Sequence, residues 1–348
     1  MTMEKSAFTN VIFSVIVILV MILLVPGSGY SEGKPQKFIW SMYTSMPPVF
    51  TPPRIYKSIF DAVRKKTGGK LDIKLFTAGQ LPYKMEDELS IVSKRRVEVC
   101  DVNNQHTSGY RDWMGLTSQA VVFKDINEAK DMWSGPIMDW ANTKLKKMDN
   151  VIALAPMILA NQSIWSKKKI ASLEDLKGKR IRVPDAFAEG FIKALGAHPV
   201  YMQFAEMNEA VMRGTIDGVL TATHMALENP NWTNIYKGEL LCEVNYSLSY
   251  FCVNLEAFEE LPVELKNILR AEALDKISQM NTGLLNKLDV AKTYVKNPPP
   301  GLTVVKISPE ERKRLLEIGL ELTNNWLAKP GRSAEAKELW ALIEKSRN

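Results

Sequence analysis

The sequence has few of the residues on which metal or cofactor chemistry depends. It contains three histidines, His106, His198 and His224, and they lie far apart along the chain. No HExxH motif, no paired histidines at metal spacing and no Cys–His ligand pattern occurs. The GxGxxG, Walker A and GxSxG motifs are absent as well. We therefore expect no metal and no cofactor. An enzyme is a minor alternative, since only a triad assembled from distant residues would escape this search.

Cysteine is also scarce, and three cysteines do not make a disulfide framework. Cys242 and Cys252 are candidates for one disulfide in an oxidising compartment, which would leave Cys100 free. In the alternative, which we favour, all three are small buried hydrophobic residues.

The chain lacks a concentrated basic surface segment. Its formal net charge is +6, but lysine and arginine are spread along the sequence. The run Lys167-Lys168-Lys169 is short and no aromatic residues alternate with it. This pattern excludes nucleic acid as an expected partner and suits a protein that binds a small anion.

Only one long apolar run occurs, at the start of the chain. Residues 11–25 are apolar except for Ser14, Lys5 precedes them, and small residues follow from Gly27 to Ser31. This is the pattern of a signal peptide covering residues 1–31, with cleavage after Gly29 or Ser31. The run is shorter than the roughly 20 residues of a spanning helix, although an uncleaved anchor stays open. We expect export to the periplasm.

The chain after residue 31 exceeds the usual single domain of about 100–200 residues, which favours two lobes. Residues 37–42 read as a strand, residues 55–66 as an amphipathic helix and residues 71–76 as an alternating strand. The prolines between residues 47 and 53 predict a loop. This order predicts a parallel sheet with helices on its faces.

A second region, residues 172–221, repeats strand and helix signals at short intervals. Ser172 and Asp175 predict a helix start, residues 179–183 a strand, and Pro184-Asp185 a turn whose aspartate caps the next helix. Further strands are predicted at residues 198–203 and 215–221. In such lobes ligands bind beyond the carboxyl ends of the strands.

Residues 262–296 keep helical spacing of apolar residues without an internal proline. A helix of about 35 residues would extend roughly 50 Å, more than one small lobe requires. We therefore expect a helix that spans both lobes. Ser308-Pro309-Glu310-Glu311 then opens the first of two amphipathic C-terminal helices.

Arg182 is the strongest site candidate on physical grounds. It lies in the strand Ile181-Arg182-Val183, directly before the turn at Pro184. A guanidinium at that strand end can hold a carboxylate through two parallel hydrogen bonds. Equally, Arg182 could pair with a local acid such as Asp185 or Glu189.

Several segments together resemble one transporter family. They are Leu176-Lys177-Gly178-Lys179-Arg180-Ile181-Arg182-Val183-Pro184, Leu195-Gly196-Ala197-His198-Pro199-Val200, Phe204-Ala205-Glu206 and Gly214-Thr215-Ile216-Asp217-Gly218. In order and spacing they resemble the core of TRAP (tripartite ATP-independent periplasmic) transporter solute-binding proteins. The resemblance extends over the mature chain, from residues 37–43 through Gly79-Gln80-Leu81 to Leu261-Pro262.

The resemblance implies a fold and a function. The fold is a two-lobed α/β periplasmic binding protein with a mixed sheet in each lobe, a hinge cleft and a long helix across both lobes. We place lobe I at residues 36–159 plus 248–287 and lobe II at residues 160–247 plus 288–348. Such proteins close on an organic acid and deliver it to a small and a large TRAP membrane subunit driven by an ion gradient.

The resemblance also assigns ligand-binding residues. Arg182 matches the family's carboxylate-binding arginine, and Phe204 matches an aromatic residue that packs on the ligand. Departures from the family pattern place Gln162 where sialic-acid binders have a second arginine, Thr221 where many members have an amide, and Asn103 where some have an acid. One arginine predicts a monocarboxylate. The apolar part of the ligand would then contact aromatic side chains, for which the candidates are Trp40, Tyr43, Trp165 and Phe187.

Other functions stay open beside this one. The same fold and ligand would serve a periplasmic sensor that feeds a signalling receptor. A secreted enzyme and a different transporter class with a similar two-lobe fold are further alternatives. The long helix argues against the last, because a strut across both lobes is not expected there.

Overall fold

The structure is a computed structural model that describes residues 36–117, 119, 122–123, 125–223, 229 and 231–346. The expected signal peptide at residues 1–31 and His224 lie outside the described residues. Residues Lys37–Asn348 form one compact unit, to which the following description applies. Within the described residues no helix is both long and apolar enough to cross a bilayer.

The first sheet begins with the βαβ unit that the sequence predicts. Strands β1 and β2 pair with each other in parallel, and helix α2 connects them along the chain. Strand β1 also pairs in parallel with β3. Two long antiparallel strands complete the sheet in the order β2-β1-β3-β9-β4. The bounds are β1 (Phe38–Tyr43), α2 (Thr51–Lys66), β2 (Leu71–Phe76), β3 (Val99–Asn103), β4 (Val151–Ser166) and β9 (Tyr246–Asn254).

Helix α2 starts earlier than the prolines suggest. Pro52 and Pro53 lie in the first turn of the helix and do not form part of a loop. The backbone N–H groups of the first turn have no partner within the helix, so proline is tolerated there. The expected loop is therefore confined to the residues before Thr51.

The second sheet shares strand β4 with the first. Strands β7, β5 and β6 follow β4, with β5 parallel to both of its neighbours and β7 antiparallel to β4. Strand β8 pairs with the far half of β4, and β10 pairs with β8. The bounds are β5 (Arg180–Val183), β6 (His198–Tyr201), β7 (Gly218–Ala222), β8 (Gly238–Leu241) and β10 (Thr303–Lys306). Both sheets are mixed, as expected.

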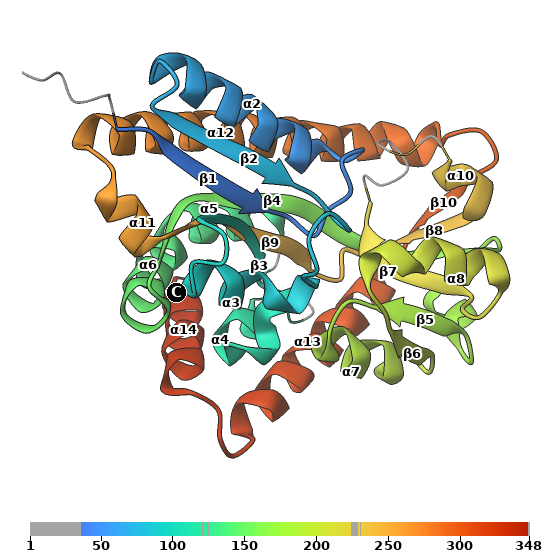
Figure 1. Ribbon diagram of the computed structural model, residues 1–348. Helices are drawn as coiled ribbons and strands as arrows, with labels where there is room; N and C mark the ends of the chain where they lie inside the picture. The colour runs from blue at the N-terminus through green and yellow to red at the C-terminus, as the bar shows by residue number, and fades with distance from the viewer. Residues whose placement is uncertain are drawn as a thin grey trace, which may run out of the picture. The chain divides into compact units, whose positions relative to one another are not determined.

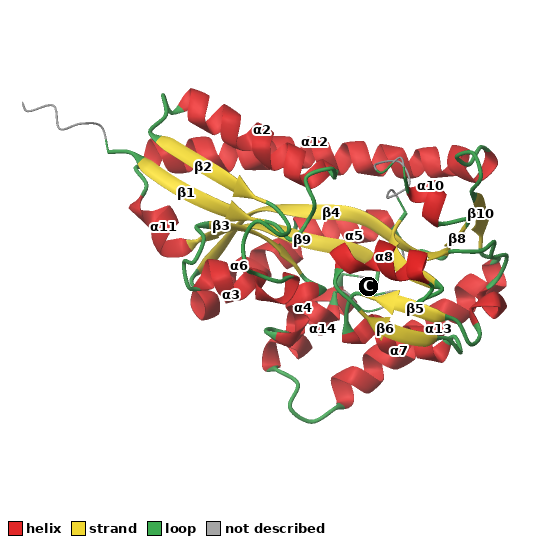
Figure 2. Cartoon of the chain, turned by 45° about the vertical axis from the view of Figure 1, so that its right-hand side comes forward, coloured by secondary structure: helices red, strands yellow, loops and turns green. Residues whose placement is uncertain are grey.

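The remaining helices cover the faces of these sheets (Figures 1 and 2). Asp185 caps α7 by accepting hydrogen bonds from the backbone N–H groups of Phe187 and Ala188, as the sequence predicts. The bounds are η1 (Met85–Asp87), α3 (Glu88–Ser93), η2 (His106–Gly109), α4 (Asp112–Leu116), α5 (Ile126–Ser134), α6 (Pro136–Asp149), η3 (Leu173–Leu176), α7 (Ala186–Ala194), η4 (Phe204–Glu206), α8 (Met207–Arg213), α10 (Trp232–Ile235), α11 (Leu255–Glu260), α12 (Val263–Lys296), α13 (Pro309–Ala328) and α14 (Ala334–Lys345).

The long helix α12 confirms the expected strut. It lies along α2 and β4 in Figure 1, and Leu269 and Ile277 join the buried cluster between α2 and the first sheet. Asn281 fixes the helix to β4, because it accepts a hydrogen bond from Ile158 N and donates one to Pro156 O. Near the end of the helix, Val295 packs on the cluster beside the second sheet.

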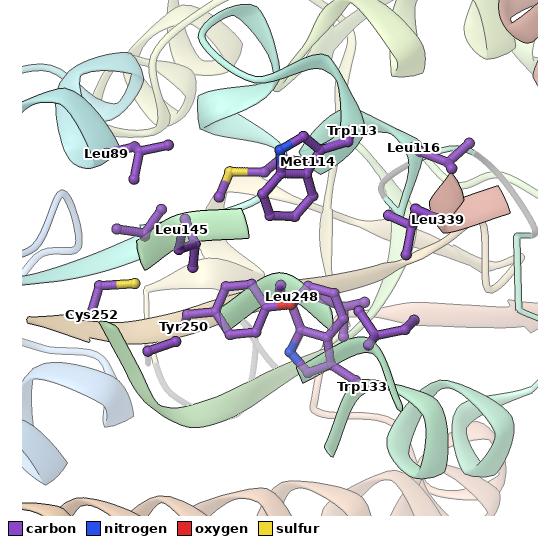
Figure 3. Close-up of a cluster of buried hydrophobic side chains, with 14 of the residues drawn as sticks. Leu89, Trp113, Met114, Leu116, Trp133, Leu145, Leu248, Tyr250, Cys252 and Leu339 are labelled. Atoms are coloured by element: carbon purple, nitrogen blue, oxygen red, sulfur yellow. The ribbon is translucent and has the colours of Figure 1, made fainter. Parts of the chain in front are cut away.

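The largest hydrophobic cluster lies on the other face of the first sheet. Figure 3 shows Trp133 against Tyr250, and their rings stack with centroids 4.4 Å apart. Leu339 of α14 belongs to this cluster, as does Trp326 near the end of α13. The C-terminal helix therefore packs with the elements of lobe I, although the sequence places residues 288–348 in lobe II. We propose that the chain has two lobes and that α14 belongs to lobe I.

All three cysteines are buried and free. Cys242 and Cys252 lie in different hydrophobic clusters, whereas Cys252 faces Cys100 in the β3–β9 register. Burial raises the pKa of the Cys242 thiol to about 12 and the pKa values of the other two thiols well above their usual range. Such thiols are poor nucleophiles because little thiolate forms.

We predict that no cysteine reacts with a thiol reagent in the folded protein and that all three react after unfolding. Burial protects the sulfurs, and the absence of a disulfide leaves each of them reduced. Ellman titration before and after addition of guanidinium chloride measures both counts. A titre of one thiol in the unfolded protein would instead reveal a disulfide, and reductant would then lower the Tm.

Candidate functional site

A cavity of about 60 Å³ lies where strands of both sheets end. The first sheet contributes residues after β1 and at the end of β3, and the second contributes the ends of β5 and β7. This is the position at which parallel sheets bind ligands. The lining residues are Ser45, Met46, Glu88, Asp101, Asn103, Gln105, His106, Gln162, Arg182, Pro184, Phe204, Thr221 and Ala222.

Arg182 is almost completely buried at this cavity, with 2% of its surface exposed. Its Nε donates to Met202 O at 3.0 Å and its Nη1 to Leu220 O at 3.2 Å. A guanidinium has five N–H groups, so most of its donor capacity is not used by these two bonds. Burial lowers the pKa of Arg182 to about 10, and the guanidinium is therefore still charged at neutral pH.

The local acids do not form an ion pair with Arg182. Asp185 caps α7 with Oδ1, and Glu189 pairs with Lys193 at 2.7 Å. Asp185 does act on Arg182 through space, and burial raises its own pKa to about 6. The structure therefore contains neither of the two local pairs that the sequence left open.

Gln162 reaches the cavity from the second half of β4, where it faces Ala222 of β7 in the strand register. Its Nε2 donates to Gln105 Oε1 at 2.8 Å, and both amides are buried. The pair could equally form with both amides reversed, because the O and N atoms of an amide are similar in size. In either orientation, one donor and one acceptor of the pair have no hydrogen-bond partner among the described residues.

Two more predicted residues lie on the wall that the second sheet contributes. Thr221, 4% exposed, is opposite Ser163 in the β4–β7 register. Phe204 follows β6 and packs against Phe50 in a T-shaped arrangement with ring centroids 5.5 Å apart. The second sheet and the segment after β6 thus contribute a threonine and an aromatic side chain to the cavity lining.

Asn103 reaches the cavity from the end of β3, and it is tied to Glu88 of α3. Glu88 Oε2 accepts from the backbone N–H of Asn103 at 2.9 Å, and its Oε1 accepts from Ser45 Oγ at 2.6 Å. The same oxygen lies 3.3 Å from Nδ1 of His106. Glu88 is 1% exposed, so this buried network orders the cavity wall beside the first sheet.

Asp101 is a second buried acid on this wall. Its Oδ2 accepts one long hydrogen bond from Thr44 Oγ1, at 3.4 Å. Burial raises its pKa to about 7, the charge of Glu88 adds to this rise, and the hydroxyl groups of Tyr56 and Ser249 oppose it. Asp101 therefore changes charge near neutral pH.

The structure does not bring the four candidate aromatic residues to the cavity. Trp40 and Tyr43 belong to the clusters on the two faces of the first sheet, and Trp165 packs against Trp232 with centroids 5.4 Å apart. Phe187 meets Trp326 with centroids 5.3 Å apart. The reason is that helices cover both faces of these sheets, and the four aromatic side chains pack into the hydrophobic clusters beneath those helices.

Glu88, Asp101, Gln105 and His106 also line the cavity, and none of them was predicted from the sequence. Three of them lie in or after β3, in the segment Asp101-Val102-Asn103-Asn104-Gln105-His106. Polar side chains at the end of an apolar strand are the same signal that identifies Arg182. Glu88 gives no such signal, because it lies in a short helix and reaches the cavity only through the fold.

Comparison with known families identifies the chain. Residues 56–329 match the model of the bacterial extracellular solute-binding protein, family 7. A curated relative, the monocarboxylate 2-oxoacid-binding periplasmic protein of Nostoc sp., is 23% identical over 325 residues, which cover 88% of this chain and 84% of that protein. Several other curated relatives are matched over only about half of their own length.

Solved structures share the fold. A Bordetella pertussis extracytoplasmic solute receptor binding pyroglutamic acid is 22% identical with a TM-score of 0.76, over 88% of this chain and 99% of that chain. A TRAP periplasmic solute binding protein from Ralstonia eutropha H16 with bound (S)-2-acetolactate is 20% identical with a TM-score of 0.79, over the same shares of the two chains.

We predict that Asp101→Asn stabilises the protein more at pH 8 than at pH 5. Because the pKa of Asp101 is raised on folding, the folded state binds the extra proton between about pH 4 and 7. The contribution of Asp101 to the free energy of unfolding is therefore greatest at acidic pH, and it falls as the pH rises through 7. The change is at most a few kcal/mol, since one pKa unit corresponds to about 1.4 kcal/mol.

The measurement is the difference in Tm between the variant and the wild type from pH 5 to pH 8. Asp72→Asn on β2 is the matched control, because Asp72 is an acid of the same sheet outside the cavity. A difference in Tm that stays flat across this range would show that Asp101 ionises at its ordinary pH.

Proposed function

Because the chain belongs to the bacterial extracellular solute-binding proteins of family 7, we propose that it captures a small monocarboxylate in the periplasm and that Arg182 holds the carboxylate. The observation that carries this proposal is the environment of Arg182. The guanidinium is buried, charged and bonded only to two backbone carbonyl groups among the described residues.

A buried charge without a partner is costly, and a carboxylate in the cavity would relieve that cost. The unused N–H groups of Arg182 are suited to two parallel hydrogen bonds with one carboxylate. Arg182 is also the single arginine or lysine among the described lining residues. One such cation supports one carboxylate on the ligand.

The ligands named for related proteins also support a small monocarboxylate as the ligand of this chain. Pyroglutamic acid, (S)-2-acetolactate and the 2-oxoacids named for the relatives each carry one carboxylate beside neutral polar groups. In this chain Gln162, Thr221 and Asn103 would meet the neutral groups, and Phe204 would pack on the apolar part. A screen of organic acids decides which member of this class the chain binds.

The mechanism that we propose is closure of the lobes around the ligand. Both sheets contribute lining residues, so a ligand bonded to both walls would stabilise the closed form over an open one. The closed form would then deliver the ligand to the small and large TRAP membrane subunits for uptake driven by an ion gradient. No covalent step is part of this mechanism. Residues 1–31 would direct export and then be removed.

We predict that Arg182→Ala lowers the affinity for the carboxylate by about 2–5 kcal/mol, roughly 30-fold to several thousand-fold. The variant loses the charged hydrogen bonds to the ligand. Isothermal titration calorimetry measures the affinity, after a thermal-shift screen of organic acids identifies a ligand that raises the Tm of the wild type.

Arg180→Ala is the matched control in the same strand. Arg180 is exposed and pairs with Asp217 through Nη2 and Oδ1 at 2.9 Å, outside the cavity. We expect its affinity for the ligand to equal that of the wild type. The proposal fails when Arg182→Ala, folded as judged by circular dichroism, shows the same ligand-induced rise in Tm as the wild type.

A further inference from the structure

The cavity wall contributed by the first sheet carries two buried carboxyl groups that Arg182 does not neutralise. Glu88 and Asp101 both line the cavity and are at most 3% exposed. The acid that acts on Arg182 through space is Asp185. The cavity therefore has a cation on one wall and a separate acidic pair on the other. The role of this pair rests on the proposed function, because it concerns the same ligand.

The surroundings of the two acids differ. Glu88 accepts from Ser45 Oγ and from the backbone of Asn103, and His106 lies against its Oε1. Asp101 meets hydroxyl groups alone, and the bond that it accepts from Thr44 Oγ1 is long. His106 acts on Asp101 through space, but among the described residues Asp101 forms no ion pair.

Two buried amides that line the same cavity add acceptor capacity. The amides of Gln162 and Gln105 leave one oxygen without a protein partner in either orientation, and both amides are buried. Buried polar groups in folded proteins almost always have a partner. The pair also leaves one nitrogen without a protein partner, which an acceptor on the ligand would satisfy. The unpaired amide oxygen and Asp101 each require a donor from the ligand.

A ligand with a carboxylate and an apolar body would leave these acceptors of the cavity without a donor. Its carboxylate would pair with Arg182, but its body would remove water from Asp101, which already repels Glu88. A positive group on the ligand would instead favour the ionised form of Asp101, because an opposite charge at close range stabilises a carboxylate. Complementary charge also rejects ligands that lack the positive group.

We propose that the ligand is an amino carboxylate whose carboxylate pairs with Arg182 and whose ammonium group faces Asp101 and Glu88. The cavity volume of about 60 Å³ favours short-chain members of this class. Because one water molecule needs roughly 10–15 Å³ of such space, the cavity has room for about four to six water-sized groups.

A specific alternative is a neutral polar group on the ligand. If Asp101 is protonated in the complex, it can donate a hydrogen bond to the hydroxyl or keto oxygen of a hydroxy acid or 2-oxoacid. The two arrangements give opposite preferences among ligands of equal length, so a comparison of matched ligands separates them.

The experiment compares matched carboxylates with and without an amine. The probes are glycine, alanine, β-alanine and proline, each paired with the hydroxy, oxo or unsubstituted acid of the nearest size, such as glycolate, lactate, pyruvate and propionate. Calorimetry at pH 7 gives the affinity of the wild type, Asp101→Asn and the control Asp72→Asn. We expect at least one amino carboxylate to bind about tenfold or more tightly than its amine-free partners, the usual order of a coupling energy between close charges.

The variant tests the role of Asp101 directly. We expect Asp101→Asn to lower the ratio of affinities, amino carboxylate over amine-free acid, by about tenfold or more, because the amide is isosteric but carries no charge. Asp72→Asn should keep the wild-type ratio. A loss of both classes of ligand to the same extent in Asp101→Asn would show a structural role and would contradict the proposal.

Other outcomes separate this inference from the proposed function. Amine-free acids that bind the wild type as tightly as the amino carboxylates, or more tightly, overturn the inference and leave the carboxylate-binding function in place. If no carboxylate of either kind stabilises the wild type, the proposed function and the inference both fail. If Arg182→Ala still binds the ligand, the proposed function and the inference also both fail.

Discussion

The burial of the Arg182 guanidinium is the interaction on which the site depends. A charge that has left water must be held by fixed dipoles, and here the carbonyl groups of Met202 and Leu220 hold it. Those two carbonyls belong to the segment after β6 and to β7, so one side chain joins three neighbouring strand ends. The position and orientation of the guanidinium are therefore set before any ligand arrives, which lowers the cost of binding.

Strand β4 belongs to both sheets and thereby places the wall of the first sheet opposite Arg182. Its first half pairs with β9 in the first sheet, and its second half pairs with β7 and β8 in the second. Gln162 lies in the second half and contacts Gln105, which follows β3 of the first sheet. One hydrogen bond between two buried amides thus connects the two walls, while α12 supports β4 from the outside through Asn281.

Much of this arrangement could be predicted from local sequence signals. Turns at Pro184-Asp185 and caps such as Ser308 determine where strands and helices end, and residues at strand ends reach the cavity. Strand position or the family resemblance indicates five residues that all line the cavity: Arg182, Gln162, Phe204, Thr221 and Asn103. The aromatic candidates do not line it, because Trp40 and Trp165 lie inside covered strands. Glu88 and α14 could not be placed, since their contacts join segments far apart in the sequence.

Glu88 and Asp101 decide how selective the cavity can be. Arg182 alone would accept any small carboxylate, because the same two hydrogen bonds form with each of them. The acidic pair adds a cost that depends on the rest of the ligand: removal of water raises the energy of Asp101 unless the ligand brings a donor or a positive charge. Carboxylates without a donor or a positive charge are then rejected because they leave Asp101 buried and unpaired. The free-energy cost of an unpaired buried group is larger than the gain from one more favourable contact.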